Sequence, residues 1–251
     1  MLQSKEFIIV KSFLTVVLLA AGTIFSASAA PALAQTSAPT LTKASNVVLV
    51  HGAWADGSSW SEVIPYLQAA GLKVTSVQNP LSSLADDVAA TRRALALQDG
   101  PTVLVGHSYG GTVISEAGVD PKVSALVYVA ARAPEAGEDF AATSGKFPTT
   151  PVRAGIETHD GFQIIGEQAF VDHFANGLPK EKAEMLFAVQ QPISASLFGQ
   201  KTTAAAWKDK PSFYAVSTKD ETTSPDLQRV LATRMKATTV EIASGHLSLV
   251  T

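Results

Sequence analysis

Short apolar, β-branched runs alternate along most of the chain with segments whose apolar residues recur at helical spacing. The first run, N-V-V-L-V from Asn46 to Val50, lacks polar alternation, as a strand buried on both faces of a parallel sheet does. Further strands are predicted at 73–77, 102–105, 125–130, 213–217 and 239–243. Helices are predicted between them, one capped by Ser58 or Ser59 and ended by Gly71, the others at about 84–97, 109–117 and 225–236. This alternation predicts an α/β fold with a mostly parallel, doubly wound sheet.

The regular rhythm stops between Ala133 and Lys210. This stretch has Gly and Pro punctuation, many aromatic residues and two helix-like pieces, at 167–176 and 180–190. We therefore expect one domain over residues 46–251, with a small helical cap inserted at about 133–210.

The N-terminus has the pattern of an export signal. Lys5 and Lys11 come before a nearly unbroken apolar run from 13 to 25. The run is followed by A-S-A at 27–29 and A-L-A at 32–34. Small residues in this spacing fit signal peptidase, whereas a retained anchor helix needs a run of about 20 apolar residues. We predict a signal peptide over 1–34, cleaved after Ala34, a flexible linker over 35–45, and a periplasmic or secreted bacterial protein without a stable membrane anchor.

Composition narrows the possible functions. A chain of 251 residues with 46% hydrophobic and 16% charged residues suits one compact domain. The net charge of -3 and the lack of any Lys/Arg-rich cluster argue against a nucleic-acid partner. Without cysteine there is no disulfide, thiolate nucleophile or Cys-ligated metal. We expect neither a metal nor a cofactor, and the sequence leaves the oligomeric state open.

The pattern G-H-S-Y-G at 106–110 stands directly between a predicted buried strand and a predicted helix. That context is typical of a nucleophile elbow, in which a sharp turn exposes a serine hydroxyl at the carboxyl edge of the sheet. Glycines two residues either side of Ser108 allow the backbone to approach closely. The alternative is a Gly-rich packing turn. We interpret Ser108 as a catalytic nucleophile.

A serine nucleophile needs a base and a carboxylate that orients the base. His246 follows the last strand in S-G-H-L, whereas His51 and His107 fit loop bracing, and His159 and His173 fall in the expected cap. The predicted base is therefore His246, in the chain order Ser, Asp, His.

For the acid, Asp220 lies just beyond the strand at 213–217, at the same edge of the sheet. Glu221 is adjacent and could take this role, and Glu135 or Asp139 is a more remote alternative. We predict Asp220.

Two backbone amides are predicted to bind the oxyanion that develops during acyl transfer. One is the N–H of Tyr109, directly after the nucleophile, and the other is that of Ala53 in the loop H-G-A-W after the first strand. Trp54 is predicted to line the substrate pocket. An equally good interpretation is that its large indole packs in the hydrophobic core.

Together, V-L-V-H-G-A-W from Val48, G-H-S-Y-G-G from Gly106, the strand A-L-V-Y-V-A-A-R-A-P, T-K-D at Asp220 and G-H-L at His246 resemble the bacterial branch of the α/β-hydrolases. That branch is similar to the plant methyl esterases and hydroxynitrile lyases, and the likeness spans essentially the whole mature chain. It implies the α/β-hydrolase fold, a cofactor-independent enzyme and an apolar pocket under a small cap.

Two positions separate the resembling subfamilies. The lyases place a threonine where Gly52 stands and a lysine where Leu247 stands, so the resemblance favours hydrolysis. Members usually continue into a final helix after the catalytic histidine, whereas this sequence has five residues after His246. We therefore expect a missing C-terminal helix.

These features predict a serine hydrolase that cleaves carboxylic esters of small or aromatic apolar substrates through an acyl-enzyme. One alternative is a lyase or hydrolase of C–C or C–N bonds that uses the same triad. Another is a ligand-binding homologue without catalytic activity.

Overall fold

The computed structural model describes residues 15–22 and 43–250. The predicted cleavage site at Ala34 and most of the predicted linker lie outside these ranges. Residues 15–21 form a short helix whose Val16, Val17, Ala20 and Ala21 side chains are buried in the core. Within the described ranges, no helix has both the length and the apolar character needed to cross a bilayer. Export stays a prediction.

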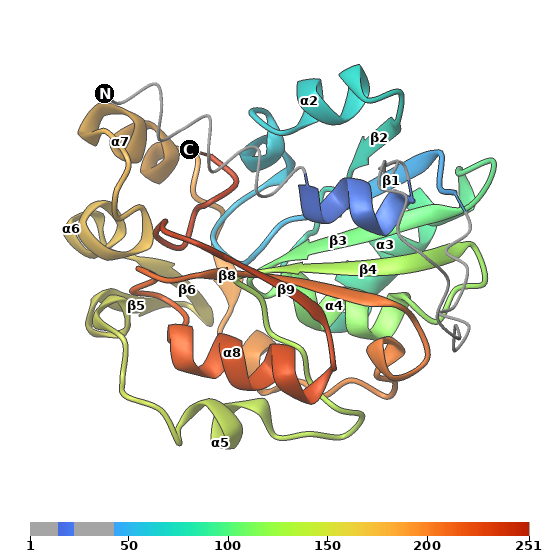
Figure 1. Cartoon of the computed structure of the whole chain (residues 1–251). Helices are drawn as coiled ribbons and strands as arrows, with labels where there is room; N and C mark the ends of the chain where they lie inside the picture. The colour runs from blue at the N-terminus through green and yellow to red at the C-terminus, as the bar shows by residue number, and fades with distance from the viewer. Residues whose placement is uncertain (1–14, 23–42, 251) are drawn as a thin grey trace, which may run out of the picture.

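Six parallel strands form the central sheet, in the order β2-β1-β3-β4-β8-β9 (Figure 1). Their bounds are β1 Asn46–Val50, β2 Lys73–Ser76, β3 Thr102–His107, β4 Val123–Val129, β8 Ser212–Ser217 and β9 Thr238–Ile242. The connecting helices are α2 Ile64–Ala69, α3 Leu84–Ala96, α4 Gly110–Ala117 and α8 Pro225–Arg234. The inner strands β1 and β3 are buried throughout, because helices cover the sheet. The predicted doubly wound fold is confirmed.

The first predicted helix is wrong in its start and its cap. A 3-10 turn, η1 Gly57–Trp60, is capped by the Asp56 side chain, which accepts from the Ser58 N–H at 2.7 Å. The α-helix α2 begins only at Ile64, with Pro65 in its first turn. Proline has no N–H to donate inside a helix, so Pro65 is tolerated only in the first turn and the regular helix starts next to it, at Ile64.

Between β4 and β8 the chain forms the region in which the sequence predicted a cap. Its helical elements are α5 Phe140–Ser144, η2 Pro151–Gly155, α6 Glu167–Ala169, η3 Phe170–Phe174, α7 Lys180–Ala188, η4 Leu197–Gly199 and η5 Ala206–Lys208. It also holds an antiparallel sheet that was not predicted, made of β5 Ile156–His159, β6 Phe162–Ile165 and β7 Ile193–Ser194. Asp160 and Gly161 join β5 to β6 with positive φ at both residues, which is the Asp-Gly hairpin signal that the sequence contained.

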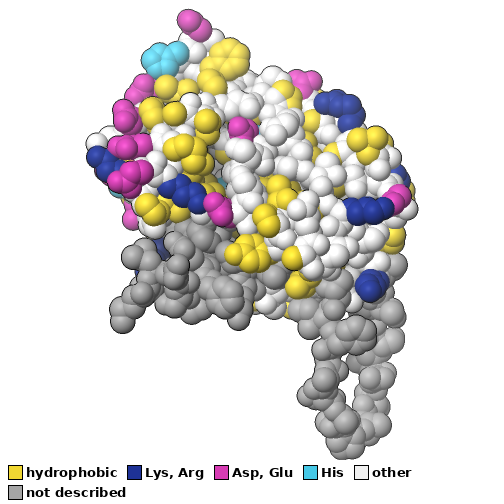
Figure 2. Space-filling view, turned by 90° about the horizontal axis from the view of Figure 1, so that it is seen from above, with side chains coloured by type: hydrophobic (Ala, Val, Ile, Leu, Met, Phe, Trp, Pro, Cys, Tyr) yellow, Lys and Arg dark blue, Asp and Glu magenta, His cyan; other side chains and the backbone are white. Residues whose placement is uncertain are grey.

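The outer surface carries mixed charge. Seen from above, acidic side chains gather toward the side on which α6 and α7 lie, and hydrophobic side chains are scattered among polar ones (Figure 2). Glu167 begins α6 and Glu181 lies in the first turn of α7, where the helix dipole favours negative charge.

Candidate active site

Ser108 occupies a sharp turn between β3 and α4. Its φ is 52°, a left-handed conformation that a non-glycine residue adopts only when the surroundings enforce it. The backbone is held on both sides: the Ser108 N–H donates to Val129 O at 3.1 Å, and its carbonyl accepts from Gly111 and Arg132 at 3.1 and 3.0 Å. The hydroxyl itself makes no hydrogen bond to any residue that the structure describes. The turn therefore leaves the hydroxyl available for chemistry.

Asp220 and His246 form a buried pair. His246 Nδ1 lies 2.7 Å from Asp220 Oδ2, and both side chains are fully buried. Asp220 also accepts from the Thr222 and Thr223 N–H groups at 2.7 and 2.8 Å and from Gln228 Nε2 at 2.8 Å. With its lone pairs occupied in this way, the carboxylate is fixed in position and orients the imidazole.

The other ring nitrogen of His246, Nε2, is buried and has no hydrogen-bond partner within the described part of the chain. His246 and His107, the residue before Ser108, are in contact, since the His107 Nε2–H donates to His246 O at 3.0 Å and the two ring centroids are 4.7 Å apart. Burial holds the pKa of His107 well below its usual value, so this ring is a neutral donor. A buried unpaired acceptor is costly, and it is expected where a proton is to be received.

A cap residue that the sequence analysis missed holds the Asp220 and His246 loops together. Asn176 Nδ2 donates to Lys219 O at 2.7 Å, and Asn176 Oδ1 accepts from the His246 N–H at 3.4 Å. The approach is close enough that a Cβ at Gly245 would lie 2.2 Å from the Asn176 carbonyl oxygen. Nothing in the local sequence pattern marks this asparagine, because its partners are far away in the chain.

The histidines that the sequence analysis set aside have other partners. His51 Nε2 accepts from the Asn79 N–H at 2.9 Å, and its Nδ1 donates to Gly52 O at 2.8 Å, so it braces the loop before Ala53. Burial lowers the pKa of His51. His159 is exposed, and His173 in the cap pairs with Glu221.

The alternative acids are likewise occupied elsewhere. Glu221 Oε2 lies 2.6 Å from His173 Nδ1, Glu135 pairs with Lys208, and Asp139 caps α5. Among these carboxylates, only Asp220 contacts His246. No group of three or more His, Asp or Glu side chains in the described ranges could hold a metal ion.

Ala53 and Tyr109 present unpaired backbone amides. Ala53 follows β1, and Tyr109 is the N-cap of α4, next to Ser108. Neither N–H has a hydrogen-bond acceptor among the residues described. Most buried amides in proteins are paired, so two unpaired amides on loops at the carboxyl ends of β1 and β3 suit a ligand oxygen.

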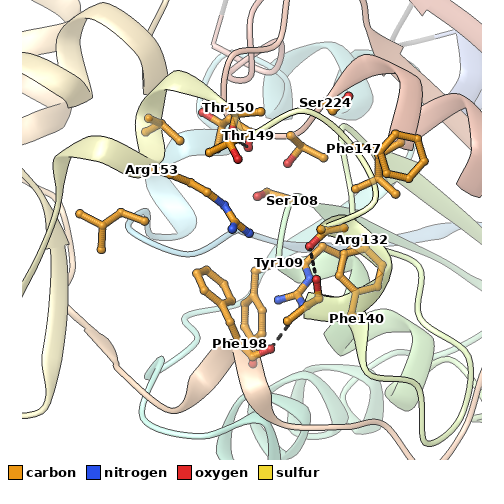
Figure 3. Close-up of a pocket in the computed structure, with 18 of the residues that line it drawn as sticks. Ser108, Tyr109, Arg132, Phe140, Phe147, Thr149, Thr150, Arg153, Phe198 and Ser224 are labelled. Carbon is orange, nitrogen blue, oxygen red and sulfur yellow. Dashed lines mark hydrogen bonds between the residues drawn. The ribbon is translucent and has the colours of Figure 1, made fainter.

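A cavity of about 450 Å³ opens in front of Ser108 (Figure 3). Trp54 lines it while only 5% exposed, and its ring contacts Phe198 with centroids 5.3 Å apart. The predicted pocket residue is therefore both core and lining. The sequence analysis missed the other main lining residues, which are Arg132, Phe140, Phe147, Arg153 and Phe198.

A buried carboxylate from α3 supports the turn after Ser108. Asp87 is fully buried, and its Oδ2 accepts from the Tyr109 hydroxyl at 2.8 Å while Oδ1 accepts from the Leu81 N–H at 2.8 Å. Burial raises its pKa from the ordinary 3.8 to about 6, against the lowering effect of these hydrogen bonds. The sequence pattern indicated only that Asp87 lies in the first turns of a helix.

This raised pKa predicts a pH-dependent stability. Between pH 4 and 6 the folded protein keeps the Asp87 proton that the unfolded chain has lost, so stability falls as pH rises through this range. The loss amounts to about 3 kcal/mol for a shift of this size. We expect Asp87→Asn to lack this part of the pH dependence in urea unfolding, whereas Asp209→Asn, at an exposed position far along the chain, retains it. A constant difference between wild type and Asp87→Asn across this range would contradict the assignment.

Comparisons with known proteins agree with this architecture. The alpha/beta hydrolase family profile matches residues 47–251. A carbendazim-hydrolysing esterase from Nocardioides sp. is 29% identical over 181 residues, covering 66% of this chain and 66% of that esterase. Methylesterase 2 of Arabidopsis thaliana is 26% identical over 213 residues, covering 72% of this chain and 81% of its own.

Solved structures show the same fold. The crystal structure of polyneuridine aldehyde esterase superposes with a TM-score of 0.71 at 20% identity, covering 82% of this chain and 94% of that one. The expected relationship to the plant methyl esterases is thus confirmed at the level of sequence and fold. With the profile matching from β1 to the end of the sequence, the chain belongs to the α/β-hydrolase family.

Proposed function

We propose that this protein is a serine esterase that hydrolyses carboxylic esters with Ser108, His246 and Asp220 as its catalytic triad. The observation that carries this proposal is the buried Asp220–His246 pair, whose free Nε2 belongs to a ring packed against the residue before the strained Ser108 turn. A protein that only bound ligands would have no use for an oriented imidazole with a buried, unpaired nitrogen.

The proposed reaction proceeds in two halves. Ser108 Oγ forms a bond to the ester carbonyl carbon while its proton passes to His246 Nε2, and the resulting oxyanion accepts hydrogen bonds from the Ala53 and Tyr109 N–H groups. The bond to the alcohol then breaks, and His246 returns the proton to the leaving oxygen. Water attacks the acyl-enzyme by the same route, which releases the acid and restores Ser108. Asp220 stabilises the imidazolium that forms in both halves.

Two positions support hydrolysis over lyase chemistry. A Cβ at Gly52 would lie 2.8 Å from the Ser108 Cβ, so the threonine of the resembling lyases does not fit here without moving the nucleophile. Leu247 is buried and apolar, and it supplies no cation beside His246.

The cavity and the named activities of the relatives support small or aromatic esters as substrates. The space of about 450 Å³ accommodates a substrate of modest size, and the Trp54, Phe140, Phe147 and Phe198 rings give it an aromatic wall. The Nocardioides and Arabidopsis relatives are named as esterases, in accord with ester hydrolysis.

Covalent labelling tests the proposal. A fluorophosphonate probe should label the wild-type protein, and Ser108→Ala should abolish labelling because the attacking oxygen is gone. Ser144→Ala is the matched control, since Ser144 lines the same cavity but its hydroxyl donates to Ala141 O at 3.0 Å. Labelling that persists in Ser108→Ala, or a wild-type protein that neither labels nor hydrolyses esters, would overturn the proposal.

A further inference from the structure

Two arginine side chains enter the cavity in front of Ser108. Arg132 lies just beyond β4, and its backbone N–H donates to Ser108 O at 3.0 Å, which ties it to the nucleophile turn. Arg153 comes from η2 on the opposite wall, and its guanidinium points toward the centre of the cavity (Figure 3). Both arginines are therefore held by elements that also shape the substrate space.

Arg132 has no acidic partner. It forms no ion pair with any described residue; its guanidinium lies 4.3 and 5.1 Å from the Phe140 and Phe198 ring centroids, and Nη2 makes one long hydrogen bond, 3.4 Å, to Phe198 O. Glu138 is near enough for its charge to raise the pKa of Arg132, but its carboxylate is hydrogen-bonded to other groups. Its Oε1 accepts from Arg234 and Thr143, and its Oε2 accepts from the Glu135 N–H. Most of the five guanidinium donors remain unused.

The cavity as a whole is cationic. Among the described residues, its lining includes both arginines and no aspartate or glutamate, although the chain carries a net charge of -3. Arg153 also forms no ion pair within the described ranges. Burial, together with the charge of Arg153, lowers the pKa of Arg132 to about 10, so the guanidinium stays protonated at neutral pH. Both guanidinium groups line the same cavity, and no carboxylate in the described ranges forms an ion pair with either, so an anion that enters the cavity meets two cationic partners.

We infer that the substrate of this esterase carries a free carboxylate in addition to the scissile ester, and that Arg132, with Arg153, binds this carboxylate. This inference rests on the proposed esterase function and adds the charge of the substrate to it. A planar carboxylate matches the fork of guanidinium donors. Three hydroxyl-bearing residues, Thr149, Thr150 and Ser224, also line the cavity, across Ser108 from Arg132 (Figure 3). The aromatic rings then hold the apolar part that joins the carboxylate to the ester.

Matched pairs of esters test this inference. On the acyl side, monomethyl adipate is compared with methyl hexanoate, which ends in a methyl group instead of the carboxylate. On the alcohol side, 4-acetoxybenzoate is compared with 4-methylphenyl acetate. We expect wild-type kcat/KM to favour the anionic member of at least one pair by about tenfold or more, mainly through KM. A ratio near or below one in both pairs would overturn the inference while leaving ester hydrolysis intact.

Variants assign that preference to Arg132. Arg132→Met should reduce the anionic-to-neutral ratio at least about tenfold, and Arg132→Lys should restore part of it, because lysine keeps the charge but not the fork. Arg92→Met, an exposed arginine of α3, is the matched control and should keep the wild-type ratio. If Arg132 had a purely structural role, Arg132→Met would lower kcat/KM for the anionic and the neutral ester together and leave their ratio unchanged. That result would contradict the inference. Arg153→Gln, at an exposed position, provides a second variant should Arg132→Met fail to fold.

A binding measurement separates this inference from the esterase proposal. In Ser108→Ala, which cannot turn over an ester, calorimetry should detect tighter binding of monomethyl adipate than of methyl hexanoate, and Arg132→Met in that background should remove the difference. This outcome would support the carboxylate site even if no ester were hydrolysed. Equal binding of the two esters would reject the carboxylate site even if hydrolysis were established.

Discussion

Asp220→Asn should lower kcat on a neutral ester by about 10⁴-fold with little change in KM. The asparagine amide would face His246 Nδ1, now 2.7 Å from a carboxylate oxygen, and would favour the ring tautomer that carries its proton on Nε2. An imidazole in that tautomer cannot accept the Ser108 proton. The fold should persist, since the asparagine oxygen can still accept from the Thr222 and Thr223 N–H groups.

Glu221→Gln is the matched control for this prediction. Glu221 is the neighbouring carboxylate that the sequence could not separate from Asp220, and it contacts His173 rather than His246. We expect its kcat to stay within about threefold of wild type. Steady-state kinetics with circular dichroism of each variant checks both results. If Glu221→Gln loses as much activity as Asp220→Asn, the acid has been assigned to the wrong residue.

Gly111→Ala should reduce the free energy of unfolding by about 3 kcal/mol or more. A Cβ there would lie 2.0 Å from the Arg132 carbonyl oxygen and 2.8 Å from the Ala131 Cβ, and both atoms belong to the segment that follows β4. Arg132 cannot retreat freely, because its N–H is bonded to Ser108 O. Relief of the clash would therefore shift the nucleophile, and we expect turnover to fall about 100-fold as well.

Gly199→Ala separates this clash from a general effect of adding a methyl group. Gly199 ends η4, its φ lies outside the left-handed region, and nothing lies within 4 Å of a Cβ built there. Its free energy of unfolding should stay within about 0.5 kcal/mol of wild type in urea titrations. Equal stability of Gly111→Ala and Gly199→Ala would show that the β4 segment yields more easily than the contacts indicate.

Much of the site could be located from the sequence because its signals are local. The turn at Ser108 needs a buried strand, close-packed glycines and a helix in immediate succession, and all three are contiguous in G-H-S-Y-G. Asp220 and His246 were found by their places after strands, since parallel strands end at one edge of the sheet. Arg132 follows β4 at the same edge, so the same reasoning was available for it. An arginine at a strand end is ordinarily a solvated surface residue, and the pattern gave no reason to expect otherwise.

Other features depend on contacts between distant segments. Asp87 was expected only near the start of a helix, yet it is buried against Tyr109, 22 positions away. Asn176 bridges two loops that lie 43 and 70 positions further along the chain. The antiparallel sheet β5-β6-β7 was missed although Asp160 and Gly161 marked its hairpin, because β7 joins from a separate part of the cap.

The sequence by itself determined the fold class, the strand-turn-helix at Ser108 and the order of the proposed catalytic residues, because these follow from hydrophobic periodicity and from backbone geometry over a few neighbouring residues. Only the tertiary structure decided which carboxylate contacts His246, which cap residue joins the Asp220 and His246 loops, and that two arginines share one cavity whose described lining holds no acid. Those outcomes depend on packing across the sheet and cap, where hydrogen bonding and desolvation act between residues that no local pattern connects.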